Sequence, residues 1–318
     1  MKFRKVMVAL LLVFVIIAQG GCTFVNKQND GLNGEDVKEK LTEKPDDLSD
    51  EQQKKMIDEL YNMIKEGRQL TEVIEYIDNN IPLLSKDNAS IMVSELEEMQ
   101  KNYLPQIEEK FTREDMQQNM INENKSTSEL NQIKDMKDGA AADLLKETRN
   151  SGFKVETAEG TFFPIVDYEF YKRYSVYVTD DMREYIDIMA VESGVVPLKD
   201  AALIISWEEV LKRALGQEKF LHQYTDSIKT NDIKELYKKY VTIVFYGANN
   251  TPLFNYDSKT LVPEAKQAYL NAIRTGSDSK LLKSISTFMD TLEENNDTLT
   301  NDVEQFRKKA VEDLTDKI

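Results

Sequence analysis

Apolar residues recur three or four positions apart over most of the chain, which is the spacing of one face of an α-helix. Between Leu48 and Ser151 they form four such stripes, in the segments 56–64, 70–77, 92–111 and 130–145. Ser49 and Gln52 have the spacing of a capping box at the start of the first stripe. Pro105 lies inside the third stripe, where it predicts a kink. Short connections between the stripes favour antiparallel packing of the helices.

The segment 153–166 departs from this spacing. Its first part alternates apolar and polar residues, Ala158–Gly160 has the composition of a turn, and Thr161–Val166 is rich in β-branched and aromatic residues. This pattern predicts a β-hairpin. Helical spacing then resumes in six segments, 179–194, 206–215, 233–241, 263–273, 281–292 and 303–314. Val241–Tyr246 is compatible with either a strand or a helix.

The sequence therefore predicts a mostly α protein, a bundle-like ectodomain of about nine or ten helices with one small β-hairpin near 153–166. Aromatic content divides it into two parts. Residues 48–151 are rich in Met and hold four aromatic residues, whereas residues 152–318 hold 21. Whether these parts are separate domains stays open, because the hairpin and the change in aromatic content are the only marks of a boundary.

The first 22 residues follow a different pattern. Three cationic residues among the first five precede an uninterrupted apolar run of 13 residues, Val6–Ala18, and the segment closes on Gln19-Gly20-Gly21-Cys22. A helix that spans a bilayer needs about 20 apolar residues, so this run is too short to cross a membrane. The arrangement is that of a secretory signal peptide.

This segment resembles the signal peptides of bacterial prolipoproteins, which end in a small residue followed by a Cys. Gly21 matches the small residue, and Cys22 matches the Cys that the family modifies with a diacylglycerol thioether. Gln19 stands where the family usually has Leu or another aliphatic residue. The resemblance implies a signal peptide over residues 1–21 and lipidation of Cys22. The alternative is an ordinary secretory signal with an incidental Cys.

A lipid attached in this way holds a protein on the outer face of the plasma membrane. The composition, poor in Gly and Pro and rich in Lys, Glu, Asn and Ile, points to a Gram-positive bacterium. Residues 22–47 are polar and nearly free of large apolar side chains, so they are predicted to form a disordered acidic tether. Loss of the three cationic residues of the signal takes the formal net charge from −16 to −19. Anionic lipids repel such a body, so the lipid anchor is its expected contact with the membrane.

Composition also excludes several kinds of site. A single Cys and a single His cannot build a disulfide, or a zinc centre with several Cys or His ligands. The acidic charge argues against nucleic-acid binding, and the 12 scattered glycines argue against a nucleotide-binding loop. We therefore expect no metal and no cofactor, and neither nucleic acid nor nucleotide among the partners.

No catalytic constellation stands out in the sequence. His222, the sole candidate base, follows an apolar stripe and is interpreted as a helix-face residue. Ser277 and Lys280 have the Ser-x-x-Lys spacing of serine penicillin-binding enzymes, but the companion motifs are absent, and Ser277 is better explained as a helix N-cap. Adjacent glutamates such as Glu97 and Glu98 are interpreted as solvated helix faces.

Aromatic residues are dense between Phe162 and Tyr185, where eight fall within 24 positions. Tyrosine combines an apolar ring with a polar tip, which suits recognition of sugars or proteins. The candidate recognition surface consists of Tyr168, Tyr171, Tyr174 and Tyr177. The alternative is a core where the hairpin meets the next helix, because several of these rings are three or four positions apart.

These observations favour a lipid-anchored extracytoplasmic protein that binds a protein or an envelope polymer and catalyses no reaction. The alternative is a cell-wall or carbohydrate-active enzyme that uses a carboxylate pair near the tyrosines. A solute-binding lipoprotein is disfavoured, because such proteins usually have two α/β lobes and the predicted strand content is small.

Overall fold

The structure, a computed structural model, describes residues 48–133, 136, 139–276 and 278–316. The signal peptide, Cys22, the tether and Ser277 lie outside the described residues. The described residues all fall within one compact unit. The aromatic-poor and aromatic-rich parts of the sequence therefore belong to the same body.

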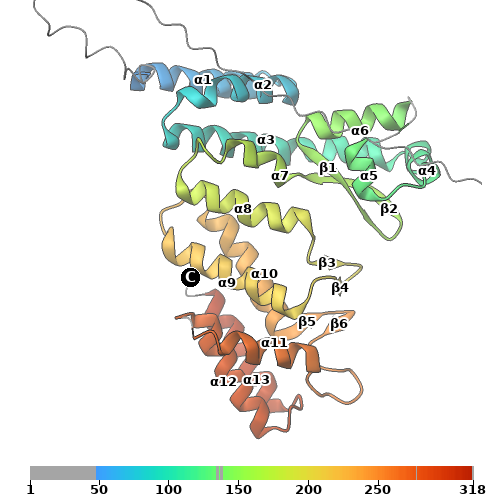
Figure 1. The fold of residues 1–318 in the computed structure, drawn as a ribbon, viewed down its shortest axis with the longest axis vertical. Coiled ribbons are helices and arrows are strands. Elements are labelled where there is room, and N and C mark those ends of the chain that lie inside the picture. Colours follow the sequence, from blue (N-terminus) through green and yellow to red (C-terminus); the bar gives the residue numbers. More distant parts are fainter. Residues whose placement is uncertain (1–47, 134–135, 137–138, 277, 317–318) are drawn as a thin grey trace, which may run out of the picture. The chain divides into compact units, whose positions relative to one another are not determined.

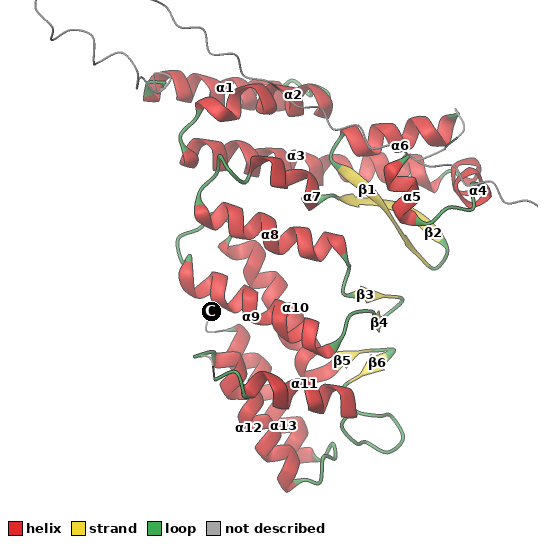
Figure 2. Ribbon diagram, viewed as in Figure 1, coloured by secondary structure: helices red, strands yellow, loops and turns green. Residues whose placement is uncertain are grey.

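The described residues are mostly helical, as the hydrophobic spacing predicts (Figures 1 and 2). They form 13 α-helices: α1 (Asp50–Lys65), α2 (Leu70–Asn80), α3 (Lys86–Thr112), α4 (Glu114–Asn122), α5 (Thr127–Gln132), α6 (Ala140–Asn150), α7 (Tyr168–Tyr171), α8 (Asp180–Gly194), α9 (Trp207–Gln223), α10 (Thr230–Tyr246), α11 (Pro263–Ile273), α12 (Lys280–Glu294) and α13 (Asn301–Thr315). Short 3-10 turns, η1 (Ile81–Leu83) and η2 (Lys172–Tyr174), follow α2 and α7. None of the helices in this part of the chain is long and apolar enough to cross a membrane.

Thirteen helices exceed the nine or ten that the sequence predicts. Two of the additional helices, α4 and α7, are short and carry no extended apolar stripe. The stretch 130–145, expected as one helix, is two, because Ile133 takes a left-handed conformation with φ of 52° that ends α5, and α6 begins after Gly139. Val241–Tyr246 forms the last turns of α10, so that segment is helical.

The predicted hairpin is present. Strands β1 (Phe153–Ala158) and β2 (Thr161–Val166) pair antiparallel over their whole length, with Phe153 opposite Val166 and Ala158 opposite Thr161. Glu159 and Gly160 connect them with φ of 49° and 74°. Positive φ at both central residues matches the right-handed twist of the strands, which explains why the sequence turns at this point.

Two further hairpins were not expected. They are formed by β3 (Leu198–Lys199) with β4 (Ala202–Leu203), and by β5 (Gly247–Ala248) with β6 (Thr251–Pro252). Strands of two residues are too short to show an alternating pattern. Each of the three hairpins connects one helix to the next, and the second and third lie side by side (Figure 1). Their contact includes a hydrogen bond of 2.8 Å from the amide of Asn250 to the carbonyl of Ala201.

The helices pack largely in chain order. Helix α3 packs on α1, α2 and β2, α7 on α8, α8 on α9, α9 on α10 and α11, and α13 on α10 and α12. Their apolar faces form one hydrophobic core that reaches from α1 to α13. This arrangement places residues of α3 beside residues of α7, α8 and the connection before α10, although they are far apart in the sequence.

Candidate functional site

Three of the four tyrosines of the candidate recognition surface are buried. Tyr168, Tyr171 and Tyr174 are 6%, 1% and 1% exposed, and Tyr177 is half-buried. The rings of Tyr168 and Tyr171 stack with centroids 5.4 Å apart, and Tyr174 packs edge-on against Tyr171. The structure therefore agrees with the alternative that these rings belong to the core. The structure places this core between α7, α8 and α3, and the predicted place was the junction of the hairpin with the next helix.

The hydroxyl groups of these tyrosines are also engaged inside the protein. Tyr168 donates to Glu97, Tyr171 donates to Gln100, and Tyr174 donates to Asp78 over 2.8 Å. All three acceptors belong to α2 or α3. No polar tip of these three rings is left to recognise a ligand at the surface.

Glu97 is the centre of this arrangement, and it corrects the interpretation of Glu97 and Glu98 as a solvated face. Glu97 is only 1% exposed, whereas Glu98 is exposed. The Glu97 carboxylate lies 2.5 Å from Nζ of Lys229 and 3.1 Å from Nζ of Lys101. It also accepts a hydrogen bond of 2.5 Å from the hydroxyl of Tyr185. We call these residues, together with Tyr168, the Glu97 network.

The environment of Glu97 holds its carboxyl in the charged form. Burial by itself would raise the pKa of Glu97, but the ammonium groups of Lys229 and Lys101 and the hydrogen bonds outweigh it, so the pKa lies below the usual value. A carboxylate that is enclosed, ionised and paired cannot give a proton to a sugar ring in solution. The carboxylate nearest the tyrosines therefore does not support the enzyme alternative.

A second buried polar cluster joins α8, α9 and α10. The hydroxyl of Tyr240 lies 2.7 Å from Glu192, and Arg213 donates to Tyr240 over 3.2 Å and to Glu209 over 2.9 Å. Burial raises the pKa of Glu192 despite these partners. Beside this cluster, Gln217 is fully buried, and within the described residues neither polar atom of its amide has a hydrogen-bond partner. A small pocket of about 240 Å³ adjoins it.

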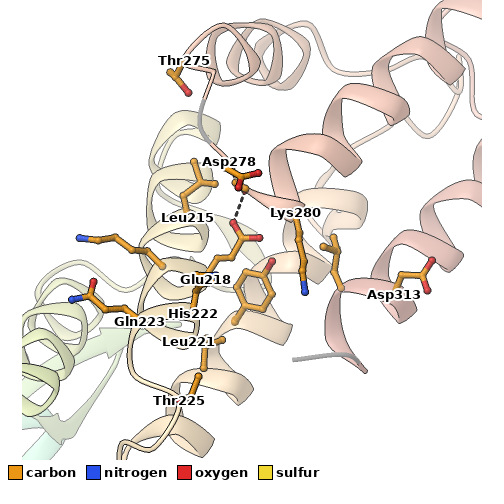
Figure 3. A pocket seen from close by; sticks show the side chains of 14 residues that line it. Leu215, Glu218, Leu221, His222, Gln223, Thr225, Thr275, Asp278, Lys280 and Asp313 are labelled. Carbon is orange, nitrogen blue, oxygen red and sulfur yellow. Dashed lines mark hydrogen bonds between the residues drawn. The ribbon is translucent and has the colours of Figure 1, made fainter.

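A large pocket lies elsewhere, between α9, α10, the start of α12 and the end of α13 (Figure 3). Its volume is about 1000 Å³, at the upper end of the range usual for small-molecule sites. Its walls are mainly apolar and include Leu215 and Leu221 of α9 and Leu314 of α13. We call it the α9–α13 pocket.

Tyr237 of α10 contributes the most unusual group of this pocket. Its side chain is fully buried, and within the described part of the chain its hydroxyl has no hydrogen-bond partner. Burial, followed by the nearby charge of Glu218, raises the pKa of this phenol, so it is neutral at physiological pH. An unpaired buried hydroxyl costs about 1–3 kcal/mol of stability.

Glu218 fixes one side of the pocket. Its two carboxylate oxygens accept hydrogen bonds from the hydroxyl of Ser279 and, over 2.9 Å, from the amide of Leu281. The first of these bonds is the dashed line in Figure 3. Ser279 is the N-cap of α12, because its hydroxyl accepts from the amide of Leu282 over 3.0 Å. The sequence predicted Ser277 as this N-cap, and the structure has the cap two residues later, at Ser279. These bonds tie the start of α12 to α9.

Charged side chains surround the opening. Asp278 pairs with Lys283, and this hydrogen bond lowers the pKa of the Asp278 carboxyl. His222 is exposed on α9, as expected for a helix-face residue. Lys280 extends from the first turn of α12 towards the pocket (Figure 3), and within the described residues it makes no ion pair. The described residues contain no cluster of three or more Asp, Glu, His or Cys that could hold a metal ion.

Sequence reasoning did not find this pocket. Most of its residues come from four helices, where each fits the apolar stripe or the polar face of its own helix, and the rest lie in the connections between helices. Tyr237 in particular belongs to the apolar stripe of α10, so nothing in its spacing marks an unpaired hydroxyl. Comparison with known proteins adds no guide, since no family model, no curated protein and no solved structure matches the chain.

Proposed function

We propose that this chain is a lipid-anchored binding protein of the cell envelope, and that the α9–α13 pocket is its ligand site. The observation that carries the proposal is the pocket itself, which has a volume of about 1000 Å³, mainly apolar walls and charged side chains at its opening. Such a combination of apolar walls with a few fixed polar groups is typical of small-molecule sites. In this proposal the chain acts at the outer face of the plasma membrane, with Cys22 as the anchor.

A binding role is favoured over catalysis by the chemistry at the pocket. Ser279 donates to the carboxylate of Glu218, but Ser279 is only 7% exposed and its hydroxyl also caps α12 by accepting from the amide of Leu282. The pair is therefore interpreted as a tie between α9 and α12, and not as a nucleophile with its base. A cell-wall or carbohydrate-active enzyme is the second candidate function. A protein or an envelope polymer is a further candidate partner, which would bind at the protein surface.

Metabolic labelling tests the anchor. Cells grown with radioactive palmitate should label the wild-type protein, whereas the Cys22→Ala variant should take up no label, because the thioether-linked lipid has no attachment site. Gln19→Leu restores the aliphatic residue usual in prolipoproteins and should label at least as strongly as the wild type. Label in the Cys22→Ala variant would contradict the proposed anchor.

Turnover of wall polymer tests the binding role. The mature chain, residues 22–318 with Cys22→Ser, should release no product from peptidoglycan fragments over long incubation. Product release would overturn the non-enzymatic proposal. Its persistence in a Glu218→Gln variant would then place the chemistry outside the α9–α13 pocket.

A further inference from the structure

Three exposed aliphatic side chains lie at the end of α8 and on the hairpin that follows it. Val191, Val195 and Ile204 are 46%, 52% and 45% exposed, although aliphatic residues of this size are mostly buried in folded proteins. A single exposed aliphatic residue needs no explanation, whereas a contiguous group of them marks an interaction surface. The backbone geometry shows whether these three are contiguous.

Val191 and Val195 share one face of α8. The amide of Val195 donates to the carbonyl of Val191 over 3.2 Å, so the two side chains are one helical turn apart on the same side. Ile188, which is half-buried, lies three positions before Val191 and extends this stripe by another turn.

The hairpin of β3 and β4, which follows α8 directly (Figure 1), brings Ile204 to the same face. Leu198 pairs with Leu203, and the amide of Ile204 donates to the carbonyl of Pro197 over 3.0 Å, so the ladder continues towards α8. Leu198 and Leu203 pack on the core, and because side chains alternate along a strand, Ile204 and Pro197 lie on the outer face. Val195 is two positions before Pro197, so it is on this outer face as well, next to Ile204.

Acidic side chains border this group of aliphatic residues. We call the group the α8 patch, which consists of Ile188, Val191, Val195 and Ile204. Ile188 and Val191 also line the small pocket between α8 and α9, where the charged lining residues are four acids, Glu184, Asp187, Glu192 and Glu209, and two cations, Lys212 and Arg213.

The cations near the α8 patch are already paired. Arg213 and Lys212 lie 2.9 Å and 3.4 Å from the same carboxylate, that of Glu209. Asp187, in contrast, is exposed and makes no ion pair among the described residues. The acids outnumber the cations even when Lys219, 3.9 Å from Glu184, is counted. The border of the patch is therefore net negative.

This combination of an aliphatic centre and an acidic border distinguishes between possible partners. Carboxylates repel the anionic lipids of a membrane surface. A second copy of the chain would bring the same acidic border against the first, because a two-fold interface uses the same surface on both subunits. A segment with aliphatic side chains flanked by Lys or Arg complements both the centre and the border.

We infer that the α8 patch docks a cationic amphipathic segment of a partner protein. The aliphatic side chains of that segment cover Val191, Val195 and Ile204, and its Lys or Arg side chains pair with Asp187. The inference goes beyond the proposed function, because none of these residues lines the α9–α13 pocket.

Peptide binding tests the inference. A fluorescein-labelled amphipathic peptide of Leu and Lys should bind saturably to the mature chain, residues 22–318 with Cys22→Ser, when followed by fluorescence anisotropy. The double variant Val195→Ser, Ile204→Ser should weaken the peptide about tenfold, because two aliphatic contacts are lost. Asp187→Asn should weaken it roughly twofold to fivefold, as expected for one exposed ion pair.

Val176→Ser and Asp58→Asn are the matched controls. Val176 is 75% exposed on the turn after η2, and Asp58 is an exposed acid of α1, so each change removes the same kind of group away from the α8 patch. Both should leave peptide binding unchanged. All the replaced side chains are exposed, so every variant should unfold at the temperature of the parent chain, and a loss of binding then reports on the surface.

Other outcomes would overturn the inference. If the parent chain and the double variant Val195→Ser, Ile204→Ser bind the peptide equally, attraction by the overall charge accounts for the binding. If a peptide of Leu and Glu binds as tightly, the charge assigned to the partner is wrong. If the patch instead binds phosphatidylglycerol vesicles, or joins two copies in sedimentation, and the double variant loses that property, the partner class is wrong. None of these outcomes alters the proposed function of the α9–α13 pocket.

Discussion

Glu97 and Tyr237 are both polar residues on buried helix faces, but only Glu97 has hydrogen-bond and ion-pair partners among the described residues. Glu97 meets two ammonium groups and two tyrosine hydroxyls, so its charge is compensated although it is only 1% exposed. Tyr237 is equally buried, but its hydroxyl meets no partner in the described residues. The first arrangement holds helices together, and the second leaves a buried donor unsatisfied within the described residues.

The Glu97 network yields a prediction at this scale. Glu97→Gln keeps the shape of the side chain but leaves the ammonium of Lys229, which is 2% exposed, without its counter-charge. Removing one partner of a buried ion pair typically costs about 3–5 kcal/mol. Urea unfolding followed by circular dichroism should show a loss of that size. Glu98→Gln, at the exposed neighbouring position, should change stability by less than about 0.5 kcal/mol.

The same variant predicts a dependence on pH. Because the pKa of Glu97 is lowered in the folded protein, its contribution to stability is complete above the usual titration range of glutamate and is lost as the pH falls through the lowered pKa. The stability difference between the wild type and Glu97→Gln should therefore shrink in acid. A difference that stays constant from neutral to acidic pH would contradict the ionised state assigned to Glu97.

At the scale of elements, each of the three hairpins follows the end of one helix and leads the chain into the next helix. The hairpin of β5 and β6 follows α10 directly, and its first residue is Gly247, with φ of 77° and ψ of −149°. That backbone conformation is essentially restricted to glycine. A β-carbon at this position would also lie 2.4 Å from the carbonyl oxygen of Thr251 and 2.6 Å from the amide nitrogen of Leu253.

Gly247→Ala is therefore expected to cost roughly 3 kcal/mol or more, from backbone strain and from the overlap with β6. Gly67→Ala is the matched control, because Gly67 also has a positive φ, of 70°, but its β-carbon would meet no atom within 4 Å. It should cost only about 1–2 kcal/mol. Thermal unfolding of both variants separates the strain of the positive φ, which both variants share, from the overlap with β6, which only Gly247→Ala has. Equal losses of stability would show that the tight approach of β5 and β6 does not contribute.

At the scale of the whole molecule, the described residues from α1 to α13 share one hydrophobic core. The ion pair of Glu97 with Lys229 joins positions 132 residues apart, and the hydroxyl groups of Tyr168 and Tyr185 reach the same carboxylate from α7 and α8. The change in aromatic content near residue 151 is therefore a change in composition within one body.

A shared core predicts a single unfolding transition. Trp207, the only Trp of the chain, lies at the start of α9 and is 5% exposed, so its fluorescence reports on the C-terminal part. Far-ultraviolet circular dichroism reports on all helices. The two signals should follow the same urea curve, because neither part can lose its helices and leave the other part covered. Two separated transitions by circular dichroism, with fluorescence following one of them, would contradict this prediction.

Local patterns in the sequence determined the class of the fold. Spacing of three or four placed most of the helices, and alternation followed by Glu159-Gly160 placed the first hairpin, because these signals depend on neighbours within one turn or one strand pair. The sequence did not predict the helix break at Ile133 or the two short hairpins, since a single left-handed residue or a two-residue strand leaves no periodic signal. The lipoprotein signal also stands on sequence alone, and it stays a prediction.

Only the tertiary structure decided which polar groups are buried and which side chains they pair with. A helical stripe indicates that a residue faces inward, but it does not tell whether the side chain meets a partner from another helix. That is why Tyr168, Tyr171 and Tyr174 could be predicted as either core or surface, and why Glu97 was assigned to solvent. The α9–α13 pocket depends on four helices meeting around Tyr237, and that meeting is set by long-range packing, which a local pattern does not encode.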